Sequence, residues 1–298
     1  MLKQPSSEYK GFRTRGIRLS EDMLPELSRL YGARTQPMQG IMHAFDKAHT
    51  VMLVEEGLIR REHGAAILAA LRTMEKDGVA EVRRTTGGGL HSGEQYLIRV
   101  LGEDVGGRIH LARSSGDLSS VGINVLLRSV LLEVMEGVNR LRGVLLGLAR
   151  QHMETILPGY SFGQHAQPMT LAHLWLSWTV NLARDFERLR GAYRRVNQSP
   201  AGAVIMVGSD FPLNRARTAE LLGFDSVHEN SADAILELTA DDSLETPMVL
   251  ALLYHSMAKW ADDLILWSTS EFGGHPTRDR VAWLRRRWRR ASSVHPLR

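Results

Sequence analysis

The chain has 298 residues, 43% of them hydrophobic and 23% charged, which is enough to bury one large core or two ordinary ones. Its net charge is +4, and it contains no cysteine, so disulfides, thiolate catalysis and cysteine-based metal sites are excluded. The N-terminus has no apolar signal core, and charged residues should interrupt every apolar stretch before it spans a bilayer, so we expect a cytoplasmic protein without membrane contact.

Residues 1–113 mix short helical patterns with loops and predict a small N-terminal helical domain. The clearest pattern is the amphipathic stretch over residues 42–71. The glycine cluster at residues 87–89 precedes a helical pattern and could form an anion-binding loop at a helix N-terminus. It lacks the spacing of a P-loop and a preceding strand, which favours an ordinary flexible connection.

From residue 119 to about residue 153 the apolar residues recur at alternating steps of four and three. Such a heptad stripe predicts a helix on the order of 50 Å long. A helix of this length needs other long helices beside it. The stripe consists of Leu127, Leu131, Val134, Val138, Leu141, Leu145 and Leu148.

Two further long helices are predicted. Pro168 suits the first position of one helix, and Ser231 suits the N-cap of the other, which Pro247 should bend or interrupt. The first apolar stripe is Leu171, Trp175, Trp178, Leu182, Phe186, Leu189, Tyr193 and Val196; the second is Leu250, Leu253, Met257, Trp260, Leu264 and Trp267. The fold class is therefore all-α, and an elongated bundle leaves faces that favour a homo-oligomer.

Six separated segments resemble argininosuccinate lyases of the aspartase/fumarase superfamily, in the correct order. They are residues 48–53 (AHTVML), 107–117 (GRIHLARSSGD), 158–168 (PGYSFGQHAQP), 211–215 (FPLNR), 229–234 (ENSADA) and 263–268 (DLILWS). The resemblance covers about residues 20–273 and makes residues 114–273 an incomplete central bundle of the aspartase/fumarase type. It implies a homotetramer with active sites shared between subunits.

The resemblance also implies an elimination reaction. A base removes the proton next to a carboxylate, an aci-carboxylate forms, and the C–N bond of an N-substituted aspartate breaks to release fumarate and an amine, which is arginine for argininosuccinate. Such a site needs preorganised hydrogen-bond donors around the carboxylate and a positioned base. No metal and no organic cofactor is implied.

The segment from Arg113 to Asp117 matches substrate-binding positions of the family. Ser114 and Ser115 can donate hydrogen bonds to a substrate carboxylate at the start of the long helix, or can cap that helix, and both interpretations stay open. Family members usually carry Ser-Arg-Asn-Asp here, so Ser115 and Gly116 replace an arginine and an asparagine. Each lost donor could be worth a few kcal/mol in a dry site.

In the segment at residues 158–168, Ser161 keeps the hydroxyl of the family's catalytic threonine, and Gln164 keeps a substrate-binding amide. Phe162 replaces the family's histidine, and a phenyl ring can neither move a proton nor donate a hydrogen bond. His165 could substitute for it, but a helix start at this point would turn His165 away from Phe162. We therefore expect impaired chemistry.

Other polar residues fall in family-like segments. His91 and Asn230 are predicted to bind substrate, and His91 and His110 are expected to line the cleft. The histidines, including His49 and His173, lack the paired spacing of metal ligands, so no metal site is predicted. Residues 203–204 are Ala-Val where the family has Ser-Gly, which makes a polar segment apolar.

After residue 273 the family continues into a mobile loop that carries its catalytic serine, and this sequence does not match it. Residues 274–298 instead form a tail with eight arginines and one acid, a net charge of +7, which leaves −3 for residues 1–273. With Trp283 and Trp288, the tail could bind nucleic acid or anionic membranes. We favour an extension with no evolved role and expect no nucleic-acid partner.

The main hypothesis is an argininosuccinate lyase-like carbon–nitrogen lyase, truncated before the catalytic loop, with little or no activity in this chain alone. The alternative is a non-catalytic scaffold or partner subunit of a lyase-type oligomer.

Overall fold

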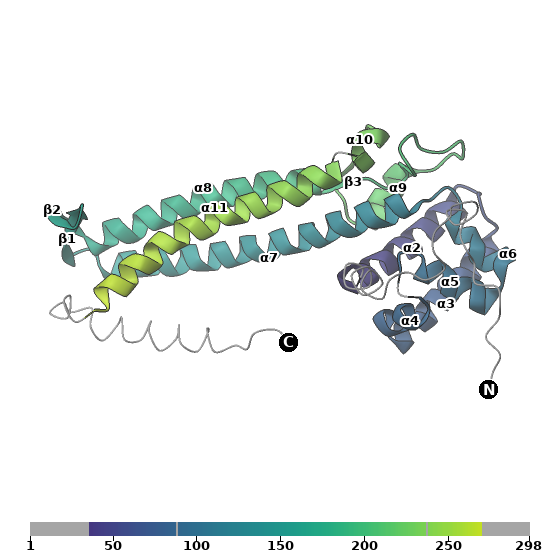
Figure 1. The fold of residues 1–298 in the computed structure, drawn as a ribbon, viewed down its shortest axis with the longest axis horizontal. Coiled ribbons are helices and arrows are strands. Elements are labelled where there is room, and N and C mark those ends of the chain that lie inside the picture. Colours follow the sequence, from purple (N-terminus) through teal and green to yellow (C-terminus); the bar gives the residue numbers. More distant parts are fainter. Residues whose placement is uncertain (1–35, 88, 237, 270–298) are drawn as a thin grey trace, which may run out of the picture. The chain divides into compact units, whose positions relative to one another are not determined.

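The computed structural model describes residues 36–87, 89–236 and 238–269 of the chain. Within these residues the fold is helical apart from two pairs of short strands, which confirms the all-α prediction (Figure 1). The tail at residues 274–298 lies outside the described residues. The domain boundaries predicted at residues 113 and 273 stay predictions.

Two compact units make up the chain. The first ends at residue 132 and also includes residues 193–244; the second comprises residues 133–192 and those from residue 245 onward. Three long helices, α7 (Ser115–Gln151), α8 (Leu171–Val196) and α11 (Leu238–Trp267), each begin in one unit and end in the other.

The first unit begins with the helices α2 (Gln39–Glu55), α3 (Arg61–Asp77), α4 (Val79–Thr85), α5 (Ser92–Leu101) and α6 (Glu103–Gly106) and the 3-10 turns η2 (Gln36–Met38) and η3 (Gly107–His110). The amphipathic stretch predicted over residues 42–71 forms most of α2 and α3. Their apolar faces pack with α5 and η3 into one core, which contains Met52, Leu53, Ile59, Ile67, Ala70, Leu71, Met74, Leu97 and Ile109.

The rest of the first unit surrounds the start of α7. It contains β3 (Gln198–Ser199), which pairs in parallel with β4 (Ser226–Val227), and the helices α9 (Arg215–Leu221) and α10 (Ser231–Leu236). Arg128 on α7 holds this region, because its guanidinium donates to Asn197 Oδ1 and to the carbonyls of Leu222 and Gly223. These bonds satisfy carbonyls at the end of α9.

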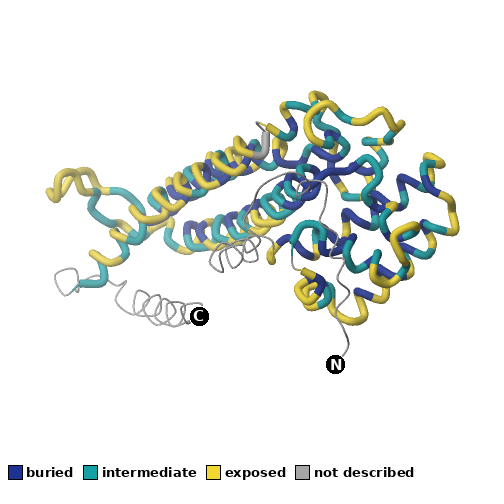
Figure 2. The backbone as a smooth tube through the Cα atoms, turned by 45° about the vertical axis from the view of Figure 1, so that its right-hand side comes forward, coloured by how far each residue is buried: buried dark blue, intermediate teal, exposed yellow. Residues whose placement is uncertain are grey.

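In the second unit, parts of α7, α8 and α11 lie side by side (Figures 1 and 2). The predicted stripes are confirmed on α7 and α8, where every member is buried or half-buried. Tryptophans join α8 to α11, with the rings of Trp178 and Trp260 stacked at 5.1 Å between centroids. In the predicted α11 stripe, by contrast, Met257 is exposed. Many apolar side chains outside the stripes of these helices are exposed as well.

The predicted helix start at Pro168 is wrong. Residues 156–170 form an antiparallel hairpin of β1 (Ile156–Ser161) and β2 (Gln164–Thr170), in which Pro158 pairs with Pro168. Helix α8 begins only at Leu171. The hairpin turn is made by Phe162 and Gly163, both with positive φ, a local conformation that an apolar periodicity does not encode.

The predicted cap at Ser231 and the predicted interruption at Pro247 are also wrong, while a bend at Pro247 stays a prediction. The Asn230 side-chain oxygen caps α10 by accepting the N–H groups of Ala232 and Asp233, whereas the Ser231 hydroxyl donates to the Met206 carbonyl. Pro247 lies inside α11, which continues through it. Packing against the neighbouring helices thus stabilises α11 by more than it loses through the one backbone hydrogen bond that Pro247 cannot make.

By length and composition alone, α7 is long and apolar enough to cross a membrane, so the expectation that charges interrupt every such stretch is wrong for this helix. The core helix of a soluble bundle has the same properties, and the stripe along α7 is covered by protein. The observation is therefore weak evidence for a membrane span.

Candidate functional site

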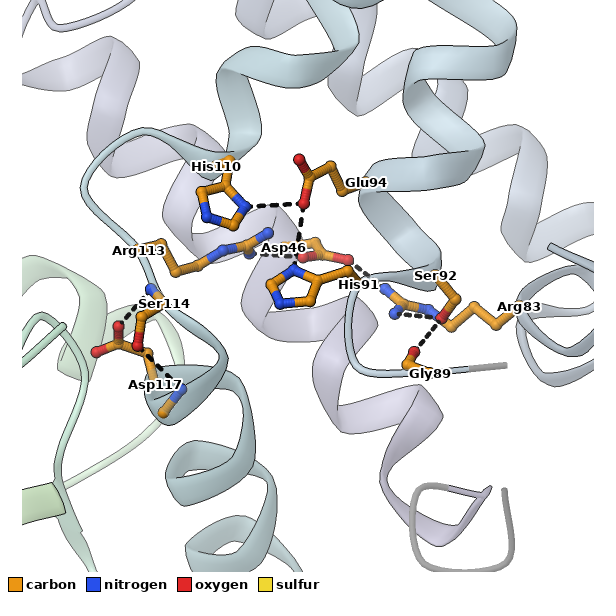
Figure 3. Close-up of polar contacts among 11 residues, drawn as sticks. Asp46, Arg83, Gly89, His91, Ser92, Glu94, His110, Arg113, Ser114 and Asp117 are labelled. Atoms are coloured by element: carbon orange, nitrogen blue, oxygen red, sulfur yellow. Dashed lines mark hydrogen bonds and ion pairs between the residues drawn. The ribbon is translucent and has the colours of Figure 1, made fainter. Parts of the chain in front are cut away.

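The segment that leads into α7 is built around its own cap. The Ser114 N–H donates to Asp117 Oδ2 at 2.9 Å, and the Ser114 hydroxyl accepts the Gly116 N–H at 2.9 Å (Figure 3). The same hydroxyl donates to the Val204 carbonyl at 2.6 Å. This reciprocal arrangement follows the logic of a capping box and satisfies N–H groups of the first turn. Ser114 is thus a cap, while Ser115 is the first helical residue.

Asp117 ties this helix start to the loop that contains Gly202 and Val204. Its Oδ1 accepts the N–H groups of Gly202 at 2.9 Å and Val204 at 3.1 Å. The side chain is fully buried, and burial raises the pKa of Asp117 despite these backbone donors. Val204 has a φ of 60°, which is strained for a β-branched residue. The carboxylate therefore fixes a strained loop beside the first turn of α7.

Arg113 is held by a second buried carboxylate. Its Nη1 donates to Asp46 Oδ1 at 2.6 Å, and Arg83 pairs with Oδ2 of the same residue. Burial alone would raise the pKa of Asp46, but the Arg83 and Arg113 guanidiniums outweigh burial and hold that pKa below its usual range. The triad joins α2, α4 and the segment before α7 (Figure 3).

Asp46 and Arg83 are site-supporting residues that the sequence interpretation missed. In the sequence, the signal for a buried acid was the position of Asp46 on the predicted apolar face of the stretch over residues 42–71, after Met42 and Phe45 and before His49. Neither its burial nor its two partners follow from periodicity, because the arginines come from positions 37 and 67 residues away.

His91 lies beside a third buried carboxylate. The Nδ1 atoms of His91 and His110 lie 3.2 Å and 2.8 Å from Oε2 of Glu94. Burial raises the pKa of Glu94, but hydrogen bonds from His110 and His91 outweigh it and lower the pKa to about 2. The two imidazole rings stack at 5.1 Å. The structure therefore groups His91 with His110 and adds Glu94, which the sequence interpretation missed; that the two histidines line a cleft stays a prediction.

His49 has a structural position. Its Nε2 hydrogen-bonds the Leu111 carbonyl at 2.9 Å, and burial together with the nearby Arg113 charge lowers the pKa of His49 to about 3. A neutral imidazole thus supports the segment before α7. A small pocket beside it is lined by Phe45, His49, Met52, Ala112, Arg113, Asp117, Ala201, Gly202, Leu213, Arg215 and Thr218.

The remaining predicted site residues fall into two places. Asn230 caps α10 in the first unit. Ser161, Phe162 and Gln164 lie at the tip of the hairpin in the second unit, and all three are exposed. The premise that a helix start separates His165 from Phe162 is wrong, because both residues belong to this hairpin region; His165 instead lies 3.2 Å from the Tyr160 hydroxyl.

With this geometry established, comparisons with known proteins are decisive for the family. A family model described as Lyase matches residues 21–281. The chain belongs to this lyase family. The argininosuccinate lyase of Methanosarcina barkeri is 43% identical over 229 residues, which cover 77% of this chain and 46% of that protein. The chain thus spans about half the length of the curated relatives that it matches.

Solved structures agree with this lyase family. A crystal structure of EDDS lyase in complex with formate is 32% identical, has a TM-score of 0.75 and is matched over 85% of this chain and 51% of that chain. A fumarate lyase from Mesorhizobium sp. BNC1, at 20% identity and a TM-score of 0.66, is similar in fold alone, over 83% of this chain and 58% of that chain. The predicted aspartase/fumarase-type fold is confirmed.

Proposed function

We propose that this chain is an argininosuccinate lyase-like carbon–nitrogen lyase of impaired activity, which cleaves an N-substituted aspartate into fumarate and an amine. The observation that carries the proposal is the start of α7. Ser115 begins a helix of 37 residues, and its position is fixed by the Ser114 cap, by Asp117 and by the buried Arg113 pair. A helix N-terminus held in this way favours a carboxylate.

In this proposal, Ser115 donates to a substrate carboxylate at this helix start. Gly116 contributes by letting the first turn pack closely against the Val204 carbonyl, since a Cβ there would lie 3.0 Å from that oxygen. Arg113 and Asp117 position that turn, because both side chains are occupied by protein partners. His91 and Asn230 contribute to substrate binding at the edge of the site. The EDDS lyase relative holds formate, a carboxylate, in its crystal structure, which supports the ligand class.

Ser161 and Gln164 are proposed to contribute the family's hydroxyl and amide from the hairpin. Phe162 is fully exposed at its tip and offers no proton-transfer group, which is the physical reason for impaired activity. We place the protein in the cytoplasm as a homotetramer that needs neither metal nor organic cofactor for the elimination. The exposed apolar side chains of the long helices support subunit contacts; examples are Val144, Leu176, Val180, Met248, Leu252, Tyr254 and Ile265.

The test is fumarate release from argininosuccinate, followed by ultraviolet absorbance. Slow release above the uncatalysed rate is expected, with a loss in Ser115→Ala and none in the control Ser129→Ala, whose hydroxyl is exposed and bonds only within α7. Equal rates in Ser115→Ala and the unmodified chain would contradict the role of the helix start.

Restoring the family's imidazole gives a second test. Phe162→His should raise the rate by about 10²-fold or more, since general acid–base catalysis contributes on that scale. The exposed position and its φ of 50° suit histidine, so the fold should tolerate the change. Phe211→His, at another exposed phenylalanine, is the matched control and should leave the rate unchanged.

A second function, a non-catalytic scaffold, is favoured by the same exposed apolar faces. It predicts a defined oligomer by light scattering together with no fumarate from either the unmodified chain or Phe162→His. Turnover in either protein would rule against a purely structural role.

A further inference from the structure

Three side chains around the start of α5 bring their ligand atoms to one point. His91 directly precedes α5, Glu94 lies in its first turn, and His110 ends η3 (Figure 3). One ring nitrogen of each histidine and a Glu94 carboxylate oxygen all lie within 4.8 Å of one another. Both imidazoles approach the same oxygen, Oε2. Of the three residues, only His91 is given a ligand role above, in substrate binding, and that role does not use Glu94 or His110.

The scaffold that presents these atoms is tightly packed. Leu97 on α5 and Ile109 on η3 are fully buried in the same core. Gly106 lies so close to α5 that a Cβ there would be 2.4 Å from the Leu97 carbonyl oxygen. Because only glycine permits this approach, the spacing between α5 and η3 is defined by backbone contact. The three ligands are therefore preorganised, which reduces the entropic cost of binding an ion.

The charge balance of the cluster calls for a cation. The Glu94 side chain is 2% exposed, and its ion-pair partners in the described residues are the two histidines, with no lysine or arginine. Asp46, by contrast, is neutralised by two arginines. Buried charges are paired or coordinate metals, and a neutral imidazole supplies no charge. Glu94 is thus a buried anion without a permanent counter-charge.

We propose that His91, Glu94 and His110 form a binding site for one first-row divalent transition-metal ion, such as Zn²⁺, Co²⁺ or Ni²⁺. Two imidazole nitrogens and a carboxylate are a ligand set that these ions accept. The Nδ1–Oε2 separations of 2.8 Å and 3.2 Å match the roughly 3 Å between ligands that each lie about 2.0–2.2 Å from one ion. The histidine side chains are 31% and 27% exposed, so solvent reaches the site and completes the coordination with water.

Binding involves no redox step. In the ion-free cluster the two Nδ1–H groups donate to the Glu94 carboxylate. On binding, each Nδ1 gives up that proton, so that a neutral imidazole protonated on Nε2 offers its Nδ1 lone pair and any surplus proton goes to solvent, while the Glu94 charge offsets half of the dication. No metal site was predicted from the sequence because the histidines, His91 and His110 among them, lack the paired spacing of metal ligands. Because the chain turns back through α5, α6 and η3, His110 lies close to His91 and Glu94 although it is distant from them in sequence.

The test is Co²⁺ titration of the chelator-treated full chain at pH 7.5, followed by visible absorbance and by calorimetry. We expect one equivalent to bind, with the visible bands of a protein-coordinated ion. His110→Gln and Glu94→Gln should each weaken binding by at least tenfold. Mutation of a residue that only hydrogen-bonds to a metal ligand already costs about tenfold, and loss of a ligand should cost no less. His173→Gln, at an exposed histidine on α8, is the matched control and should bind as the unmodified chain does.

A measurement on the unmodified chain guards against variants that fail to fold. Paramagnetic Co²⁺ should broaden the imidazole NMR signals of His91 and His110 before those of other histidines. The proposal is overturned if the unmodified chain takes up no ion, if folded His110→Gln and Glu94→Gln bind it unchanged, or if His173→Gln abolishes binding. Each readout is independent of lyase activity.

Discussion

Asp46 and Glu94 are both buried carboxylates of the first unit, but they are neutralised differently. Asp46 pairs with the guanidiniums of Arg83 and Arg113, which stay charged at every ordinary pH. Glu94 pairs with two imidazoles and, among the described residues, with no guanidinium or ammonium group. The first arrangement suits a permanent structural joint. In the second, a metal ion can take the place of the imidazole N–H donors, as proposed above. The difference separates a support for the start of α7 from a ligand-competent cluster.

Removing the permanent joint should have the largest effect. Asp46→Ala leaves two buried guanidiniums without a counter-charge and should lower the free energy of unfolding by about 3–5 kcal/mol. Urea denaturation measures this loss. The control Glu81→Ala removes an exposed pair with Arg84 and should have no measurable effect. Equal stability of the two variants would show that the Asp46 triad is not a structural joint.

The pH dependence of Glu94 should be nearly as large. Its pKa falls from 4.5 to about 2 on folding, so its stabilising contribution is complete above pH 4.5 and is lost as the pH falls towards 2. That contribution is about 3 kcal/mol, from 1.36 kcal/mol per pKa unit. The stability difference between the unmodified chain and Glu94→Gln should therefore shrink between pH 5 and pH 3 in urea denaturation. A difference that is constant over this range would contradict the ion-pair account.

Gly93, next to Glu94 in sequence, tests the close contact of α5 with the Asp46 triad. A Cβ at this position would be 2.3 Å from Asp46 Oδ2 and 2.6 Å from Arg83 Nη2, so Gly93→Ala should cost about 1–3 kcal/mol by overpacking. Gly143→Ala, in open space on α7, should instead stabilise the protein by about 0.5–1 kcal/mol. If both substitutions stabilise, the close contact of α5 with the Asp46 triad is incorrect.

Asp117 should give the smallest effect, with the opposite pH dependence. Its raised pKa means that its stabilising contribution is complete below the unfolded pKa, 3.8, and is lost as the pH rises through the folded value. Asp117→Asn removes that charge, but its amide nitrogen cannot accept, so at least one of the three backbone hydrogen bonds to this side chain is lost. The two effects oppose each other, and a net change of about 1 kcal/mol is expected at pH 7. Relative to the unmodified chain, the variant should become less stable as the pH falls. If the variant instead became more stable relative to the unmodified chain as the pH falls, the pKa of Asp117 would be lowered on folding, as that of Glu94 is.

Sequence patterns predicted the long helices because the apolar residues of a buried helix face recur with the helical period, and this period can be recognised without knowing which helices pack against that face. The stripes on α7 and α8 are buried as expected. The hairpin before α8 was missed, since its turn depends on positive φ at Phe162 and Gly163 rather than on apolar spacing. Likewise, Asn230 and Ser231 are both good capping residues, and only the position of Met206 decides between them.

The helical fold class and the lyase family could be predicted from the amino-acid sequence, because periodicity and short motifs are local properties of the chain. Tertiary structure alone decided which charges meet. Asp46 reaches Arg113 across 67 positions, and His110 reaches Glu94 across 16. Electrostatic pairing depends on distance and burial in space, and neither quantity is encoded in the spacing of residues along the chain.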